Sequence, residues 1–293
     1  MTHPHKQLQQ WLTNIDIQPK LPSDLPEWLR EFARDCREVD IHQYLNDSAR
    51  IVPETDDQGR PPRYSAVLVL LSGDADFRRP AGTTGRQAFP ADATMLLTHR
   101  APTMRNHSGQ VAFPGGRVED ADAGPIDTAL REAEEETSLD PTTVEPFAIL
   151  QPIYIDRSNF AVVPVVAWWR QPHKVSCPTT ENDWVEPFPL SELVNPQRRF
   201  EVGFAGWRGP AWNLHIGADN PLVLWGFTGG VINALLQRAG WEEPWSSGGG
   251  SSGADEPWNL FETLAGSANG EALKEMREGF DRANESGRNG GAP

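Results

Sequence analysis

The chain has 293 residues, which is long enough for one large domain or for a medium-sized domain with appendages. Its 26 Lys and Arg residues face 41 Asp and Glu residues, and the resulting net charge of −15 argues against a broad nucleic-acid-binding surface. No stretch approaches the ~18 apolar residues that span a membrane, and the N-terminus lacks the pattern of a signal peptide. We therefore expect a cytoplasmic protein without a membrane or nucleic-acid partner. With only Cys36 and Cys177, neither a disulfide framework nor a cysteine metal site is expected.

The first predicted elements are a helix and two strands. A helix is expected within residues 23–39, capped by Ser23 or Asp24, with an apolar face formed by Leu25, Trp28, Leu29 and Phe32. Apolar runs of strand length follow at 64–71 and 93–101. The segment between these runs is rich in Gly, Pro and charge, so it predicts a long exposed loop.

The second half of the chain repeats strand and helix signals after a glutamate-rich helix. Strands are expected at 147–155 and 160–169, a short helical turn at 190–196, and a strand followed by an apolar helix within 221–241. This order favours an α/β or α+β sandwich with a mixed sheet. We predict an N-terminal helical extension at 1–58, the main domain at 59–245, and a Gly/Ser-rich linker with a flexible polar tail at 246–293.

The glutamate-rich helix carries the strongest chemical signal. Glu132, Glu135 and Glu136 stand at positions i, i+3 and i+4 and therefore line one stripe of the helix, although like charges at this spacing repel each other. Three carboxylates suit Mg²⁺ or Mn²⁺, which prefer oxygen ligands. Arg131 precedes Glu135 by four residues and is placed to orient it. The alternative is an ordinary solvated acidic face.

The spacing around these glutamates resembles a known motif. After Gly116 come five residues, Asp122, eight residues and then Arg-Glu-Ala-Glu-Glu-Glu-Thr-Ser-Leu. This pattern resembles the Nudix box, in which Gly, five residues, Glu and seven residues precede Arg-Glu-apolar-any-Glu-Glu-any-Gly-apolar. Three departures are visible, namely Asp122 for Glu, one extra residue in the gap, and Ser138 for the final Gly. The first two are features of the coenzyme A diphosphatase branch of that family.

A second motif abuts the first. The stretch LLTHRAPTMRNHSGQVAFPGG at 96–116 resembles the signature of the same branch, through Leu-Leu-Thr, Arg100, Arg105, Gly109 and Phe-Pro-Gly-Gly. The resemblance implies a Nudix α/β/α sandwich over about residues 60–240. It also implies metal-dependent hydrolysis of the diphosphate of coenzyme A or acyl-coenzyme A, giving (acyl-)4′-phosphopantetheine and adenosine 3′,5′-bisphosphate.

The resemblance also implies roles for individual residues. Glu132, Glu135 and Glu136 would be metal ligands with catalytic function, together with Arg131 and a backbone carbonyl near Gly116. Glu136 is one candidate for the general base, and Glu181 on a later loop is an alternative.

Other polar residues near the motifs have two interpretations. Arg100 and Arg105 suit bidentate binding of substrate phosphates, but either is also compatible with a structural ion pair. His107 and Gln110 are candidates for substrate contacts, or for hydrogen-bonded residues of a turn.

Two rival functions stay open at this level. The box specifies diphosphate chemistry rather than the attached group, so NADH, ADP-ribose or a dinucleoside polyphosphate are alternative substrates. A non-catalytic nucleotide-binding module is the rival from a different class. In each case the partner is a small molecule, and a homodimer is possible.

Overall fold

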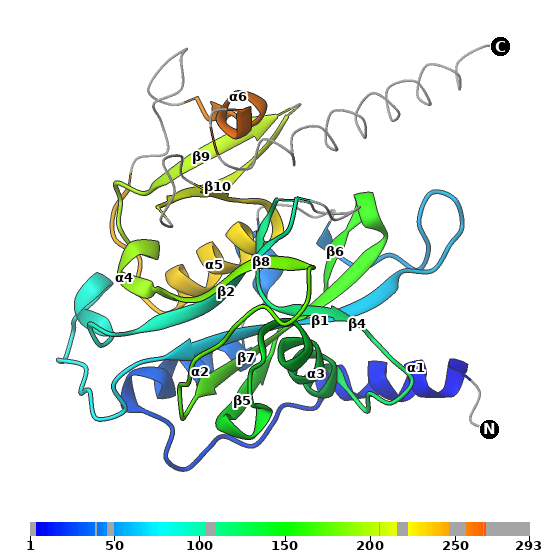
Figure 1. Ribbon diagram of the computed structural model, residues 1–293, viewed down its shortest axis with the longest axis horizontal. Helices are drawn as coiled ribbons and strands as arrows, with labels where there is room; N and C mark the ends of the chain where they lie inside the picture. The colour runs from blue at the N-terminus through cyan, green and yellow to red at the C-terminus, as the bar shows by residue number, and fades with distance from the viewer. Residues whose placement is uncertain are drawn as a thin grey trace.

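A mixed β-sheet forms the centre of the computed structural model, which describes residues 4–38, 40–45, 50–102, 109–204, 206–215, 222–245, 256–265 and 267 (Figure 1). The strands of this sheet are β1 (Arg63–Ser72), β2 (Thr94–Arg100), β3 (Val111–Ala112), β4 (Gly115–Arg117), β5 (Val144–Ile149), β6 (Ile153–Ile155), β7 (Phe160–Trp169) and β8 (Asn182–Pro189). The main path runs β3-β2-β1-β7-β5, while β4 pairs with β1, β6 with β7 and β8 with β2. Because β1 and β7 are parallel and the other pairs antiparallel, the sheet is mixed, as predicted.

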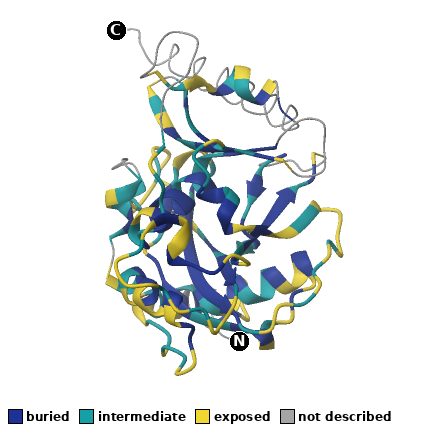
Figure 2. Cartoon of the chain, turned by 90° about the vertical axis from the view of Figure 1, so that its left-hand side faces the viewer, coloured by how far each residue is buried: buried dark blue, intermediate teal, exposed yellow. Residues whose placement is uncertain are grey.

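Helices cover both faces of this sheet, and the alternation along β1 shows how. Ala66, Leu68 and Leu70 pack on the side of α3 (Pro125–Thr137), whereas Val69 and Leu71 pack on the side of α2 (Glu27–Glu38) and α5 (Gly226–Arg238). Figure 2 shows the buried residues concentrated in the strands and on the inner helix surfaces. The predicted α/β/α sandwich is confirmed.

Elements from the N-terminal part of the chain complete both layers. Trp11 of α1 (Pro4–Thr13) is fully buried on the α3 side of the sheet. The four apolar residues predicted to share a helix face are all buried on the other side. The helix itself begins at Glu27 rather than near Ser23 or Asp24, because Leu25 precedes Pro26 and a residue before proline is disfavoured in the α conformation.

The long segment between β1 and β2 is not uniformly exposed, so this prediction was wrong in part. It contains the 3₁₀ helix η4 (Gly85–Ala88), and Ala88 and Phe89 are buried. Their apolar surface packs into the main core beside Trp241, and this burial outweighs the polar character of the flanking residues.

A second sheet follows, and the sequence patterns did not predict its main strands. It consists of β9 (Arg199–Phe204), β10 (Trp207–Leu214), β11 (Leu222–Leu224) and β12 (Trp258–Asn259), in the order β11-β10-β9-β12. One face packs on α5 and the other on α6 (Leu260–Ala265) through Leu260 and Leu264. The alternation of apolar residues along 199–214 is interrupted by Gly203, Gly206, Gly209 and Pro210. Such a pattern is typical of turns, so it did not predict strands here.

The remaining described elements are short. They are α4 (Leu190–Leu193) and the 3₁₀ helices η1 (Asn14–Asp16), η2 (Ile41–Tyr44), η5 (Pro141–Thr143) and η6 (Asp156–Ser158). Cys36 and Cys177 are free thiols. Among the described residues, the helices are all too short or too polar to cross a membrane. The division of the chain after residues 58 and 245 stays a prediction.

The aromatic cluster around Trp241 predicts a large stability effect. The Trp241 ring lies 4.8 Å from Phe32, 5.6 Å from Trp28 and 5.6 Å from Phe89, between centroids, and its side chain is buried. Trp241→Ala should lower the free energy of unfolding by about 3–5 kcal/mol in urea titrations followed by circular dichroism. Trp258→Ala, at a side chain that is 45% exposed, should cost less than about 1 kcal/mol. Equal losses in the two variants would contradict this assignment of the core.

Candidate active site

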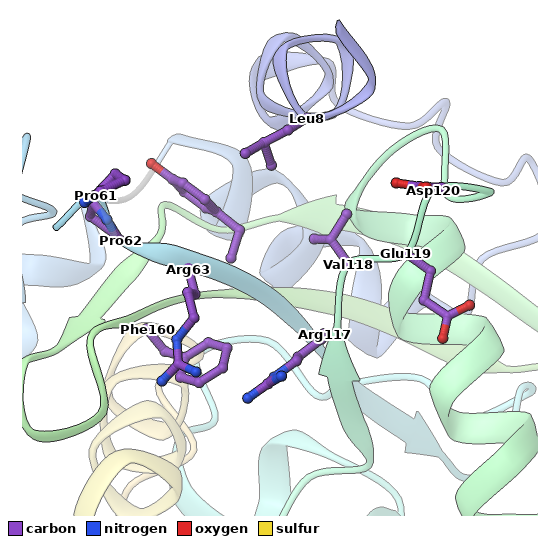
Figure 3. A pocket seen from close by; sticks show the side chains of 10 residues that line it. Leu8, Pro61, Pro62, Arg63, Arg117, Val118, Glu119, Asp120 and Phe160 are labelled. Carbon is purple, nitrogen blue, oxygen red and sulfur yellow. The ribbon is translucent and has the colours of Figure 1, made fainter. Parts of the chain in front are cut away.

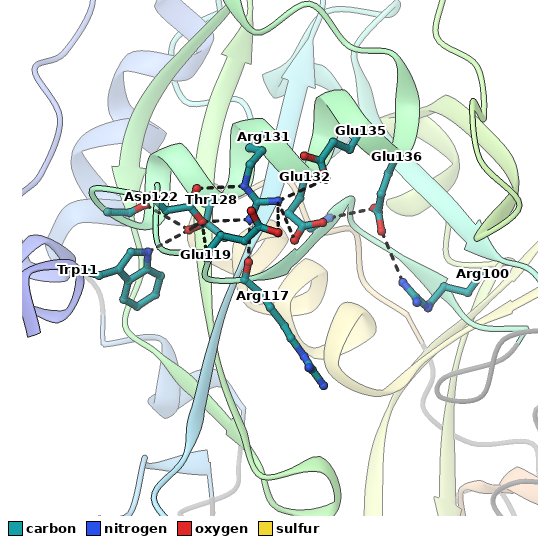
Figure 4. A network of polar contacts seen from close by, with 12 residues as sticks. Trp11, Arg100, Arg117, Glu119, Asp122, Thr128, Arg131, Glu132, Glu135 and Glu136 are labelled. Atoms are coloured by element: carbon teal, nitrogen blue, oxygen red, sulfur yellow. Dashed lines mark hydrogen bonds and ion pairs between the residues drawn. The ribbon is translucent and has the colours of Figure 1, made fainter. Parts of the chain in front are cut away.

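Strand β4 and helix α3 bring the predicted carboxylates together with the glycines that precede them. β4 pairs with β1 through Val67 and Gly115, Ala66 and Gly116, and Ser65 and Arg117. α3 packs on β1 through Ala129 and Ala133, whose small side chains allow a close approach of the helix. Glu132 and Glu136 therefore face β4, whereas Glu135 is exposed (Figure 4).

Helix α3 ends where the motif usually has glycine. Ser138 adopts the left-handed conformation, with φ of 55° and ψ of 29°, and its N–H donates to the carbonyl of Glu134 at 2.9 Å. This is the helix ending that glycine favours, because a side chain in this conformation is strained. The departure from the motif therefore leaves the helix end in place, at a cost in stability.

Glu132 lies directly against Gly116. A Cβ atom built on Gly116 would lie 2.4 Å from the carboxyl carbon of Glu132, so any other residue here would push this carboxylate away from β4. One carboxylate oxygen lies 3.2 Å from Nη1 of Arg131. Burial raises the pKa of Glu132, the neighbouring Arg131 lowers it, and repulsion from Glu135 and Glu119 raises it further, with a net shift upwards.

Glu136 is the most buried of the three predicted ligands, with 6% of its surface exposed. Its Oε2 accepts a hydrogen bond from the N–H of Gly115 at 3.1 Å, and its Oε1 lies 3.6 Å from Nη1 of Arg100. Burial raises the pKa of Glu136 to about 7, and repulsion from Glu132 and Glu181 adds to this effect, although Gly115 and Arg100 oppose it. A buried carboxylate with so little compensation is well placed to receive a cation.

Arg131 connects these carboxylates to the preceding loop. Its Nε and Nη2 donate to the two carboxylate oxygens of Asp122, each at 3.0 Å, and Nη2 also donates to the carbonyl of Arg117 at 2.8 Å. Nη1 lies 3.4 Å from Glu135, as the i, i+4 spacing predicted. The guanidinium thus positions α3, β4 and the loop between them at once (Figure 4).

Asp122 is held by more than this ion pair. Its Oδ2 also accepts hydrogen bonds from the N–H of Glu119 at 2.9 Å and from the hydroxyl of Thr128 at 2.8 Å. Trp11 Nε1 donates to the same hydroxyl at 3.0 Å, which ties α1 to the network. Burial alone would raise the pKa of Asp122, but the hydrogen bonds and the charge of Arg131 hold it below its ordinary value.

The structure places the other predicted residues unevenly. Arg100 ends β2 and faces Glu136, while the backbone of Gln110 pairs with that of Arg100 across the hairpin. Glu181 is exposed, and its carbonyl accepts a hydrogen bond from the N–H of Ala101 at 2.8 Å. This candidate base therefore lies beside the end of β2, next to Arg100. Arg105 and His107 lie outside the described residues.

The donor atoms suit a divalent cation, but the side chains do not form a closed cage. Within the described part of the chain, no three His, Cys, Asp or Glu side chains gather as a group that could hold a metal ion. Glu132 and Glu135 both turn to Nη1 of Arg131, and Glu135 is exposed. Mg²⁺ usually takes only one or two carboxylates and completes its shell with waters and substrate phosphates, so Glu132 and Glu136 beside Gly116 fit such an ion. The metal roles stay predictions.

Several members of the network were not predicted as site residues. Asp122 appeared only as a motif position, and its spacing of nine residues before Arg131 is the signal that identifies it as the partner of the arginine. Thr128 lies on α3, as Arg131 does, and six residues after Asp122. Its role as a partner of Asp122 can be seen only in the folded structure, where the loop turns back on the helix. For Trp11, 117 residues away from Thr128, the sequence offers no local signal.

Comparison with known proteins identifies relatives of this chain. The model of the NUDIX domain matches residues 84–202. A protein of Escherichia coli (strain SMS-3-5 / SECEC), described as "Uncharacterized Nudix hydrolase NudL", is 30% identical over 206 residues, which cover 70% of this chain and 98% of the relative. A protein of Citrobacter koseri with the same description is 32% identical over 180 residues, which cover 61% and 92%.

Solved structures are more distant. The Nudix hydrolase RenU of M. smegmatis is 19% identical, with a TM-score of 0.35 over 47% of this chain and 80% of that one. The NUDIX domain of Shewanella oneidensis NrtR, complexed with ADP ribose, is 16% identical, with a TM-score of 0.34 over 53% and 86%. Because these identities and TM-scores are low, the family is assigned from the sequence relatives and not from the solved structures.

The raised pKa of Glu136 predicts a pH-dependent penalty on the metal-free protein. Because the pKa is about 7 in the folded state and near 4.5 in the unfolded state, stability should fall as pH rises from about 4.5 to about 7. By linkage the full penalty is about 3 kcal/mol. In EDTA at pH 8, Glu136→Gln should therefore raise the free energy of unfolding relative to the wild type, and the difference should vanish near pH 4.

The matched control for this measurement is Glu134→Gln on the exposed side of the same helix. It removes the same charge from the same helix turn without relieving a buried carboxylate, so its stability should follow that of the wild type at every pH. An equal gain in the two variants would assign the effect to net charge and contradict the role of burial.

Proposed function

Because this chain belongs to the Nudix hydrolase family, we propose that it hydrolyses the diphosphate of coenzyme A or acyl-coenzyme A. The broader activity, hydrolysis of a diphosphate bond in a nucleoside diphosphate derivative, is that of the family. Water would add across the P–O–P bond, so that one phosphate becomes that of (acyl-)4′-phosphopantetheine and the other the 5′-phosphate of adenosine 3′,5′-bisphosphate. The narrower specificity rests on the motif at 96–116.

One contact supports the diphosphate chemistry of this proposal. The carboxylate of Glu136 lies 3.6 Å from the guanidinium of Arg100, and Arg100 comes from the motif that resembles the coenzyme A branch. The two motifs adjoin in the sequence. In the structure, this contact joins a glutamate of the first motif, Glu136, to an arginine of the second, Arg100. A diphosphate at this place would meet both a guanidinium and the carboxylates that suit divalent cations.

Each side chain then has a definite task. Glu132, Glu135 and Glu136, with a carbonyl near Gly116, would hold Mg²⁺ or Mn²⁺, which when bound neutralises diphosphate oxygens and lowers the pKa of an attacking water. Arg131 positions Glu132 and Glu135 through its contacts with both. Arg100 would bind a phosphate oxygen, and Glu136 or Glu181 would accept the proton of the water.

Product analysis tests the substrate. Purified full-length protein is incubated with coenzyme A, acetyl-coenzyme A, NADH, ADP-ribose or a diadenosine polyphosphate, in Mg²⁺, Mn²⁺ or EDTA, and the products are identified by mass spectrometry. We expect phosphopantetheine species and adenosine 3′,5′-bisphosphate from the coenzyme A substrates only when metal is present. Preferred cleavage of another substrate would contradict the specificity for coenzyme A but agree with hydrolysis of a diphosphate. Tight binding without turnover would favour a non-catalytic module.

Removing a carboxylate tests the site itself. Glu132→Gln should lower kcat by at least about 100-fold, because the variant keeps the shape of the side chain but loses the charge that holds the cation. The fold should persist, since Glu132 is a source of repulsion in the metal-free protein. Glu134→Gln is again the matched control and should keep kcat within about twofold of the wild type. Wild-type kinetics for Glu132→Gln would rule out this ligand.

A further inference from the structure

A cavity lined by two arginines lies beside β4, at the start of β1. It has a volume of about 360 Å³, a size at the lower end of small-molecule sites. Arg63, Arg117 and Phe160 line one side of it, and Leu8 of α1 and Val118 line the opposite side (Figure 3). None of these residues belongs to the carboxylate site described above, apart from the backbone of Arg117.

The sheet register explains why two arginines meet here. Arg63 of β1 pairs with Phe160 of β7, and Arg117 of β4 pairs with Ser65, two residues further along β1. Residues two apart on a strand share a face, so both arginines come to the same side. The Arg63 guanidinium carbon lies 4.2 Å from the centre of the Phe160 ring, and that of Arg117 lies 5.3 Å from it.

The two guanidinium groups lack carboxylate partners among the described residues, although the chain as a whole carries a net charge of −15. Arg63 donates one hydrogen bond, from Nη2 to the carbonyl of Ser158 at 2.6 Å. Glu119 and Asp120 also line the cavity, but Figure 3 shows their carboxylates on the opposite side of the 117–120 segment from the two guanidinium groups. Like charges beside the same ring repel, and an anion bound between them would offset this repulsion.

The neighbouring cations also affect the pKa of Arg63, although its side chain is exposed. Burial lowers the pKa of its guanidinium, and the charges of Arg117 and Arg60 lower it further. Both side chains are exposed, and each guanidinium lies close to the Phe160 ring, which leaves its N–H donors free to meet the oxygens of a phosphate. A phosphate monoester carries up to two negative charges, so it would offset both cations.

Strand β4 links this cavity to the carboxylates. The carbonyl of Arg117 accepts the hydrogen bond from Arg131, and the preceding Gly116 lies against Glu132. The side chain of Arg117 leaves the network in the opposite direction (Figure 4). A substrate with its diphosphate at the glutamates could therefore place a second anionic group one residue further along the same strand.

We infer that Arg63 and Arg117, beside the Phe160 ring, form a subsite for a phosphate monoester of the substrate that is separate from the hydrolysed diphosphate. This inference rests on the proposed function, in which the group is the 3′-phosphate on the ribose of coenzyme A. The subsite selects substrates that carry this phosphate and takes no part in the bond cleavage.

The kinetic experiment compares coenzyme A with 3′-dephospho-coenzyme A on the full-length protein. Arg63→Ala and Arg117→Ala should each raise KM for coenzyme A by roughly 10-fold, because each removes charge-assisted hydrogen bonds to the phosphate. KM for the dephospho substrate should change by less than twofold, and Arg117→Lys should retain part of the binding. Arg208→Ala, at an exposed arginine of β10, is the control and should leave both substrates unaffected. Equal changes for the two substrates would overturn the subsite.

A binding measurement decides the same question without turnover. Isothermal titration in Mg²⁺ should show that the wild type binds adenosine 3′,5′-bisphosphate at least about 10-fold more tightly than AMP, and that Arg63→Ala/Arg117→Ala removes the difference. If coenzyme A is not cleaved but this difference is found, the proposed function fails and the phosphate subsite stands. No difference in the wild type would overturn the subsite whatever the substrate, and circular dichroism confirms that each variant is folded.

Discussion

The ion pair between Arg131 and Asp122 holds together the parts from which the candidate site is built. Asp122 is 7% exposed, and its charge is balanced by two hydrogen bonds from one guanidinium together with those from Glu119 and Thr128. Removing one partner of such a buried pair costs about 3–5 kcal/mol, since it leaves an unpaired charge. The same guanidinium reaches the carbonyl of Arg117 and the carboxylates of α3, so the loop, the strand and the helix depend on it together.

The glutamates on the next turns of α3 are in the opposite situation. Asp122 has four hydrogen bonds. Glu136 is about equally buried but has one backbone hydrogen bond and an ion pair of 3.6 Å with Arg100, and Glu132 repels it. The protein thus stabilises one buried carboxylate fully and leaves another poorly compensated a few residues away. Such uncompensated charge lowers stability and is typical of functional sites, where a cation and the substrate complete the balance.

Strand β4 separates two kinds of chemistry that lie only a few residues apart. Gly115 and Gly116 contribute a backbone N–H and an unobstructed surface to the carboxylates, and Arg117 directs its charge to the opposite side. In the proposed mode of binding, acidic and basic groups would therefore approach the same ligand from different sides of β4. The elements that support β4 extend beyond residues 84–202, which match the family. These further elements are α1, α2, α5 and the second sheet, which pack on the central sheet or on each other.

Local patterns in the sequence determined much of this protein. Continuous β-branched runs identified β1 and β7, apolar periodicity identified α2 and α5, and the i, i+3, i+4 spacing placed the glutamates of α3 on one stripe. These features depend on residues within a few positions of each other, which is why they can be read without coordinates. The strands β9 and β10 escaped because glycine and proline interrupt their alternation, and the packing of α5 and α6 stabilises them instead.

Tertiary structure alone decided how the three glutamates differ. Their spacing is regular, yet the contacts of α3 with β4 bury Glu136, half-bury Glu132 and leave Glu135 in solvent. It also joined Trp11 to Thr128 across 117 residues and brought Arg63 to Arg117 across β1 and β4. The sequence by itself determined which chemical groups are present and which face of a helix or strand they share. Burial, pKa and long-range partners came from the fold, because they depend on which distant segments exclude water from each group.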